Sequence, residues 1–208
     1  MYLRFLVYFG LLAGLFLPTA KAEPLTALVL QTSLNEKDSR SDLLGDILFD
    51  KAIKAGFKVQ KISLKDFPLP LSNGHEGSAF DDKNVKTFHD KIKQAQVILV
   101  AFPIYNYAVS AATKNVFELT SHPHKNVLSG DAWMGKVVGL AGASGSSKSM
   151  LAPLGFAGSL ITDQKCHVIP HIAIAINEDF KEKEPSKELS DRLDKMIDQA
   201  KRLGAALS

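Results

Sequence analysis

The 208-residue chain contains a single cysteine, Cys166, so an intrachain disulfide is impossible. Its charge is nearly balanced, with 25 Lys and Arg residues against 22 Asp and Glu residues. The chain therefore lacks the large excess of positive charge that is typical of proteins that bind nucleic acid or an anionic lipid surface, so neither partner is expected. The chain is long enough to bury one sizeable core, which must then stabilise the fold without cross-links. Cys166 begins an apolar stretch and is interpreted as a small buried hydrophobe.

Several familiar chemical signatures are also missing. The six histidines show no ligand spacing with cysteine or acidic partners, so no metal site is predicted. No G-x-G-x-x-G occurs, which excludes the usual dinucleotide fingerprint. Residues 142–149 approach a P-loop, but Ser147 stands where the P-loop needs glycine. The same segment fails as a nucleophile elbow because Ser146 stands where G-x-S-x-G needs glycine.

The N-terminus has no apolar run of the roughly 20 residues that a membrane span requires. Residues 5–17 form an apolar run of 13 after Arg4, and Ala20-Lys21-Ala22 fits a small-residue cleavage site. This layout predicts a secretory signal peptide at 1–22, followed by one domain at 23–208 that is exported, periplasmic or secreted, with no membrane span after cleavage. Loss of Arg4 and Lys21 would lower the net charge from +3 to +1. The alternative is an uncleaved membrane anchor.

Apolar and amphipathic segments alternate along the rest of the chain. Strands are predicted at 25–30, 57–64, 97–102, 136–141 and 166–169, the last with an extension to 176 as an option. Helices are predicted between and after them, at 44–55, 82–94, 108–119, 150–161 and 189–203. This alternation implies right-handed crossovers and a parallel sheet covered on both faces. The predicted fold is therefore an α/β, flavodoxin-like three-layer sandwich with a five-stranded parallel sheet in order 2-1-3-4-5.

Three loops should meet in one crevice of this fold. In the predicted order strands 1, 3 and 4 are neighbours, and their carboxyl ends lead into residues 31–41, 103–107 and 142–147. Pro103 cannot donate to a ladder, so the third strand is expected to stop there and to leave Tyr105, Asn106 and Tyr107 in a loop. Two aromatic rings beside an amide suit a flat heterocycle. The alternative is that the tyrosines only pack.

The first and third loops suit different parts of a ligand. Ser33, Ser39 and Ser41, with the helix N-terminus beyond them, form a candidate anion site to which Arg40 adds a bidentate donor. The alternative is an ordinary helix N-cap with a solvated arginine. In the third loop, Gly142, Ala143, Ser144 and Gly145 let a planar ligand lie against backbone.

On these residues the chain resembles the NAD(P)H-dependent FMN reductase family of the flavodoxin-like superfamily. The resemblance runs from about Leu25 to Pro170. Its most specific part is Pro103-Ile-Tyr-Asn-Tyr107 followed by Lys114-Asn115, supported by residues 64–71, Gly135-Lys136 and the G-A-S-G loop at 142–145.

The resemblance implies an FMN cofactor, NAD(P)H as co-substrate, a small-molecule electron acceptor and a homo-oligomer, dimer or tetramer. No side chain would be catalytic, because the flavin carries the chemistry. The implied cofactor-binding residues are Ser33, Ser39, Arg40, Ser41, Pro103, Ile104, Tyr105, Asn106, Tyr107, Gly142, Ala143, Ser144 and Gly145.

The chain departs from the family pattern at three places. Asn35 stands where the family usually has arginine, and Ile104 where it often has an acid. Ser146, Ser147, Lys148 and Ser149 follow Gly145, where the family tends to have further glycines and an Arg or Gln. The leading hypothesis is NAD(P)H-dependent two-electron reduction of a flavin, quinone or other small acceptor. The alternatives are an exported flavin-binding protein or electron carrier without NAD(P)H turnover, and a cofactor-free relative.

Overall fold

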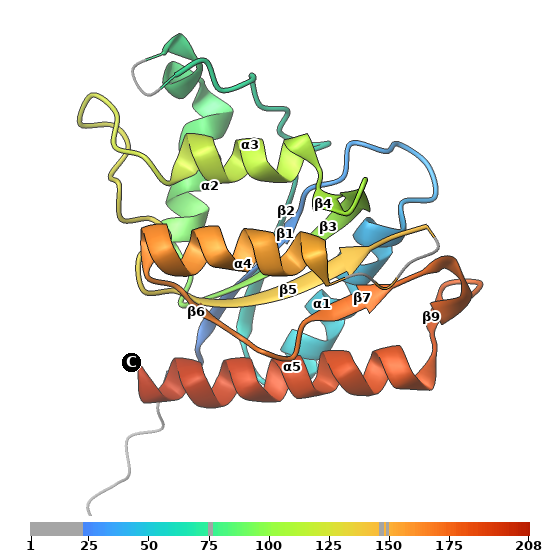
Figure 1. The fold of residues 1–208 in the computed structure, drawn as a ribbon. Helices are drawn as coiled ribbons and strands as arrows, with labels where there is room; N and C mark the ends of the chain where they lie inside the picture. Colours follow the sequence, from blue (N-terminus) through green and yellow to red (C-terminus); the bar gives the residue numbers. More distant parts are fainter. Residues whose placement is uncertain (1–22, 75–76, 146–147, 149) are drawn as a thin grey trace, which may run out of the picture.

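A parallel sheet lies between two layers of helices in the computed structural model, which describes residues 23–74, 77–145, 148 and 150–208 (Figure 1). The strands follow the order β2-β1-β3-β5-β6, and β7 also pairs with β5. Their bounds are β1 Thr26–Gln31, β2 Lys58–Ser63, β3 Val97–Tyr105, β5 Val137–Ala143, β6 His167–Val168 and β7 Ala173–Ala175. The predicted order is confirmed, with β5 as the fourth strand and β6 and β7 as two pieces of the fifth.

The predicted signal peptide, residues 1–22, lies outside the described residues. Its cleavage and the domain boundary at residue 23 therefore stay predictions. Among the helices of the described ranges, none is both long and apolar enough to span a bilayer.

The central strands β1, β3 and β5 are buried on both faces because helices cover each face of the sheet. Helices α1 Arg40–Lys54 and α5 Lys187–Ala206 pack on one face, where Leu48 and Met196 join its buried side chains. Helices α2 Lys83–Gln94, α3 Ala111–Thr120 and α4 Leu151–Gln164 cover the other. Central β3 pairs in parallel with β1 and with β5, so its apolar run from Val97 to Phe102 has no exposed side.

The prediction that the third strand stops at Pro103 is wrong, because β3 continues to Tyr105. The ladder with β1 has already ended at the pair Gln31–Ala101, while pairing with β5 continues through Pro103 and Ala143. The Pro103 carbonyl accepts the Ser110 N–H at 3.2 Å, so the polar side of this residue faces away from β5. The missing N–H therefore costs no bond to β5, and β1 no longer pairs at this position, so the strand tolerates proline there.

Short elements complete the sheet edge. After β3 the chain turns back as β4 Ala108–Val109, which pairs with β3 in antiparallel fashion. The fifth strand is interrupted near Pro170, whose carbonyl accepts the Ile172 N–H at 2.9 Å. Beyond β7 follow the 3-10 turn η2 Asn177–Asp179 and the hairpin of β8 Phe180–Lys181 and β9 Glu184–Pro185. A second 3-10 turn, η1 Ser78–Asp81, precedes α2.

Candidate functional site

A crevice of about 300 Å³ opens where β1, β3 and β5 end. It brings together the three predicted loops and adds one residue from the segment after β7. The lining residues are Ser33, Asn35, Asp38, Ser39, Arg40, Ser41, Pro103, Ile104, Tyr105, Ala143, Ser144, Gly145 and Asn177. The sheet order therefore creates the predicted convergence.

The first loop presents hydroxyl groups at the start of α1. Ser39 is the N-cap, and its Oγ accepts the Asp42 N–H at 3.2 Å. The Ser41 Oγ lies 3.2 Å from the Ser39 Oγ, and the Ser33 Oγ accepts the Asn35 N–H at 3.0 Å. Since α1 has 15 residues, its partial positive charge points at this end of the crevice. The N-cap interpretation is thus confirmed for Ser39, and it is compatible with an anion site at the same helix end.

Arg40 lines the crevice, but its guanidinium leans toward the β8–β9 hairpin. The Cζ atom lies 5.4 Å from the centre of the Phe180 ring, in a cation–π arrangement. The Nη1 atom donates to the Glu182 carbonyl over 3.5 Å, longer than a well-formed hydrogen bond. Both contacts are weak, so the guanidinium is held beside the anion site without being tied away from it.

The second loop is a tight hairpin turn at the end of β3. Ile104 and Tyr105 pair with Val109 and Ala108, which leaves Asn106 and Tyr107 as the two turn residues. Both have positive φ, 49° and 62°, as the common two-residue hairpin turn requires. Tyr105 lines the crevice, whereas Asn106 and Tyr107 do not appear among its lining residues. The rings of Tyr105 and Tyr107 are exposed beside the opening, at 59% and 60%.

Three of the four predicted residues of the third loop line the crevice, and the fourth lies behind them. Ala143, Ser144 and Gly145 line the crevice, and the Ser144 N–H donates to the Ala175 carbonyl at 2.8 Å. Gly142 lies behind them within β5 and does not line it. A Cβ added there would lie 2.7 Å from the Cδ1 of Ile104, so glycine allows Ile104 to pack against the strand. A Cβ added at Gly145 would meet nothing within 4 Å, which leaves open space over that backbone.

The sequence interpretation missed the segment after β7. Asn177 lines the crevice, and the buried Asp179 carboxylate fixes the turn by accepting the Ile176 N–H at 2.8 Å. The same carboxylate lies 2.8 Å from the ammonium of Lys148, from the third loop. A signal existed, because the sheet-edge rule points to whatever follows the fifth strand. The sequence leaves the end of the fifth strand open between residues 169 and 176, so this rule alone does not single out Asn177. Asn35 and Asp38 of the first loop were missed as lining residues as well.

Two further expectations concern groups outside the crevice. Cys166 is buried as predicted, its thiol donates to the Trp133 carbonyl at 3.1 Å, and burial raises its pKa to about 12. Within the part of the chain that the structure describes, no three His, Cys, Asp or Glu side chains gather where they could hold a metal ion.

Comparison with known proteins gives a family match over most of the chain. Residues 26–181, about three quarters of the chain, match the family model described as NADPH-dependent FMN reductase. A search of curated proteins found no match.

Solved structures share the fold at low identity. FerB, a flavoenzyme NAD(P)H:(acceptor) oxidoreductase from Paracoccus denitrificans, is 22% identical, with 85% of this chain and 97% of that chain covered and a TM-score of 0.66. The apo form of the NADH:FMN oxidoreductase EMOB is 16% identical, with 88% and 90% covered and a TM-score of 0.65. A flavodoxin from the domain Archaea is 15% identical, with 85% and 99% covered and a TM-score of 0.57.

Proposed function

Because the chain belongs to the NADPH-dependent FMN reductase family, we propose that it passes two electrons from a reduced nicotinamide, through FMN, to a quinone, a flavin or another small acceptor. FMN is the cofactor of this family, and NAD(P)H is its electron donor. The observation that carries the proposal is the crevice at the ends of β1, β3 and β5. It combines a helix N-terminus, hydroxyl groups and a wall of bare backbone.

The lining residues fit the parts of FMN. The phosphate is an anion, and the hydroxyls of Ser33, Ser39 and Ser41 surround the positive end of α1. The flat ring system needs a wall without bulky side chains, which the open space over Gly145 provides. The crevice volume of about 300 Å³ is at the small end for ligand pockets, so part of the flavin would extend past Tyr105 toward solvent.

When bound, FMN supplies the two-electron chemistry, so the chain needs no nucleophile of its own. The residues act by binding and orientation. The Ile104 side chain packs against Gly142, and its backbone pairs with Val109 in the hairpin, so Ile104 is held in the β3 wall. Asp179 fixes the turn that carries Asn177 and forms an ion pair with Lys148. Exposed Tyr105 and Tyr107 leave an aromatic surface at the opening where an acceptor or a nicotinamide can approach.

Spectroscopy of the purified protein tests this function. We expect bound flavin to give a yellow protein, NADPH or NADH to bleach it without oxygen, and a soluble benzoquinone to restore the colour. A colourless protein that fails to bind added FMN would refute flavin binding. A yellow protein that neither nicotinamide bleaches would instead support the second candidate, an electron carrier without NAD(P)H turnover.

Export of the protein would favour that second candidate, because NAD(P)H is not expected in quantity outside the cytoplasm. We propose that residues 1–22 direct export and are then removed. N-terminal sequencing of the protein from its native host should then read Glu-Pro-Leu from residue 23. A protein that retains Met1 in the cytoplasmic fraction would contradict both cleavage and export. We also propose a homo-oligomer, which sedimentation velocity would test.

A further inference from the structure

Lys65, from the segment that follows β2, reaches the first loop of the flavin crevice. Its Nζ atom donates to the Asn35 carbonyl at 3.3 Å and lies 2.5 Å from the Oδ2 of Asp42, in the first turn of α1. Asn35 lines the crevice, whereas Asp42 and Lys65 are not among its lining residues. One ammonium therefore joins the loop to the helix whose N-terminus faces the end of the crevice that suits the FMN phosphate.

The backbone after β2 holds Lys65 at this point. The ladder of β1 and β2 ends at the pair Gln31–Ser63, and the Leu64 N–H extends it by donating to the Gln31 carbonyl at 3.0 Å. The Lys65 N–H donates to the Ser63 Oγ at 3.3 Å, and the Asp66 N–H donates to the Ser63 carbonyl at 3.2 Å. This turn is thus fixed against the end of β1, where the first loop begins.

The Asp42 carboxylate depends on this cation. Its side chain is only 14% exposed, and apart from the ion pair with Lys65 its two oxygens have no polar partner within the described part of the chain. A buried carboxylate that loses its cation keeps an uncompensated negative charge. In the first turn of α1 that charge would repel an anion bound at the helix N-terminus, and it would offset the partial positive charge that attracts the anion.

We propose that Lys65 is a positioning residue for the phosphate of FMN. Its ammonium cancels the charge of Asp42, and its bond to the Asn35 carbonyl holds the first loop, so the N-terminus of α1 remains free to bind the phosphate. The inference rests on the proposed function, because it concerns the same crevice. It gives Lys65 a role in the selection of FMN over riboflavin, which has no phosphate.

Two substitutions that change the charge in opposite directions test the proposal, by titration of flavin-free protein with FMN and with riboflavin. Lys65→Met leaves Asp42 unpaired and should lower the affinity for FMN by about 2- to 5-fold, the effect of one charge in the first turn of a helix. Asp42→Asn leaves the ammonium unpaired and should raise the affinity for FMN by a similar factor. Neither substitution should change the affinity for riboflavin.

The opposite signs separate this role from a merely structural one. Damage to the fold would lower the affinity in both single variants and for both flavins. The double variant Lys65→Met/Asp42→Asn should lie between the two single variants, and Lys65→Arg should retain the preference for FMN because it keeps the cation. Asp42→Asn removes a buried charge, so it decides the question even if Lys65→Met folds poorly.

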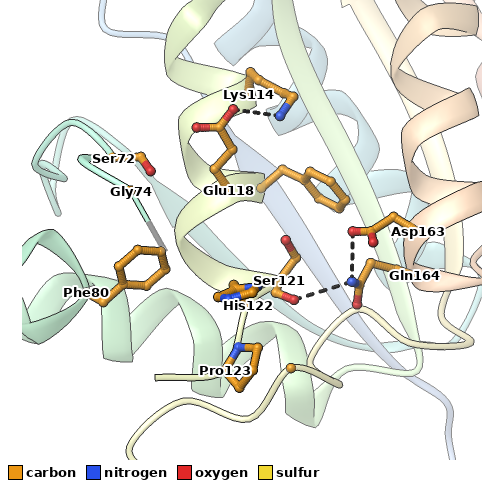
Figure 2. A pocket seen from close by; sticks show the side chains of 12 residues that line it. Ser72, Gly74, Phe80, Lys114, Glu118, Ser121, His122, Pro123, Asp163 and Gln164 are labelled. Carbon is orange, nitrogen blue, oxygen red and sulfur yellow. Dashed lines mark hydrogen bonds and ion pairs between the residues drawn. The ribbon is translucent and has the colours of Figure 1, made fainter. Parts of the chain in front are cut away.

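Matched ion pairs elsewhere in the chain provide the controls. Lys61→Met removes the 2.6 Å pair with Asp46, one turn further along α1. Glu118→Gln removes the acid that pairs with Lys114 beside a second cavity of about 630 Å³ (Figure 2). Neither Lys61 nor Glu118 lines the crevice, so both variants should keep the wild-type ratio of FMN to riboflavin affinity. A change in Lys61→Met equal to that in Lys65→Met would indicate a general charge effect and would overturn the assignment.

Amide hydrogen exchange tests the contact with the first loop without any flavin. In flavin-free protein, residues 33–41 should exchange faster in Lys65→Met than in Lys61→Met, because only Lys65 donates to the Asn35 carbonyl. Equal exchange in these two variants, or a loss of FMN affinity in Asp42→Asn, would overturn the proposal while leaving flavin binding intact. A wild-type protein that binds no FMN would instead refute the proposed function itself, and this inference with it.

Discussion

Replacement of Arg40 by alanine should lower the affinity for FMN and leave the affinity for riboflavin nearly unchanged. Arg40 is the arginine of the first loop, and it lines the crevice at the start of α1. Riboflavin lacks the phosphate, so it has no group that the guanidinium could bind. The comparison of the two ligands therefore isolates the phosphate contact from any general damage to the crevice.

The expected loss of FMN affinity is the energy of the guanidinium–phosphate hydrogen bond minus the energy of the contacts that the guanidinium makes without FMN. A charged hydrogen bond contributes roughly 1.5–3 kcal/mol. In the structure Arg40 lies over Phe180 and donates to the Glu182 carbonyl only over 3.5 Å, so the main competitor is a cation–π contact of about 0.5–1 kcal/mol. The net contribution to FMN binding is then about 0.5–2.5 kcal/mol, which corresponds to a loss of roughly 2- to 70-fold in Arg40→Ala.

Flavin fluorescence provides the assay, because binding to a protein commonly changes flavin emission. Both ligands are titrated into flavin-free wild-type protein, Arg40→Ala and Lys37→Ala. Lys37 is an exposed cation of the same loop that does not line the crevice, so it controls for long-range charge. The reasoning is refuted if Arg40→Ala loses FMN and riboflavin affinity equally, or if FMN affinity falls no further than in Lys37→Ala.

Three further predictions concern the walls and the core. Asn106→Gly keeps the positive φ of 49° but removes the side-chain amide. In the same titration it should lower the affinity for FMN by about 2- to 13-fold, which corresponds to the loss of one hydrogen bond of about 0.5–1.5 kcal/mol. Gly142→Ala should lower the free energy of unfolding in urea by about 1–3 kcal/mol, because the new Cβ would lie 2.7 Å from Ile104 Cδ1, and Ile104→Val should restore part of it by removing that carbon. Cys166, whose pKa is raised to about 12, should not react with a disulfide reagent at pH 8 until the protein is unfolded, and fast reaction of the native protein would contradict its burial.

The sheet order could be predicted from the sequence because few arrangements satisfy the chain. Runs such as residues 97–102 are apolar throughout, which is typical of strands that helices cover on both faces. Helices between such strands force parallel crossovers of one hand. These rules place β1 and β5 on either side of β3. Because the three strands are adjacent and parallel, the loops that follow them meet at one edge of the sheet.

The end of β3 could not be predicted, because it depends on a neighbouring strand rather than on Pro103 itself. A proline ends a strand only where a partner needs its N–H, and β1 stops pairing at Ala101. From the sequence alone the last β1 pair is unknown, so Pro103 indicates a strand end. This matters for the site, because Ile104 and Tyr105 stay within β3 and line the crevice, whereas Asn106 and Tyr107 form the turn beyond them.

The orientation of the Arg40 side chain also could not be predicted from the sequence, because it depends on a contact with a distant part of the chain. Helix capping and loop position can be read locally, and they place Ser39 and Arg40 at the start of α1 correctly. The partner that attracts the guanidinium, Phe180, lies 140 residues further along the chain in a hairpin too short to give a periodic pattern. Contacts of that separation are set by the packing of the whole sheet. The sequence therefore predicts that Arg40 lies at the crevice, and only the structure shows that its guanidinium lies against Phe180 and the Glu182 carbonyl.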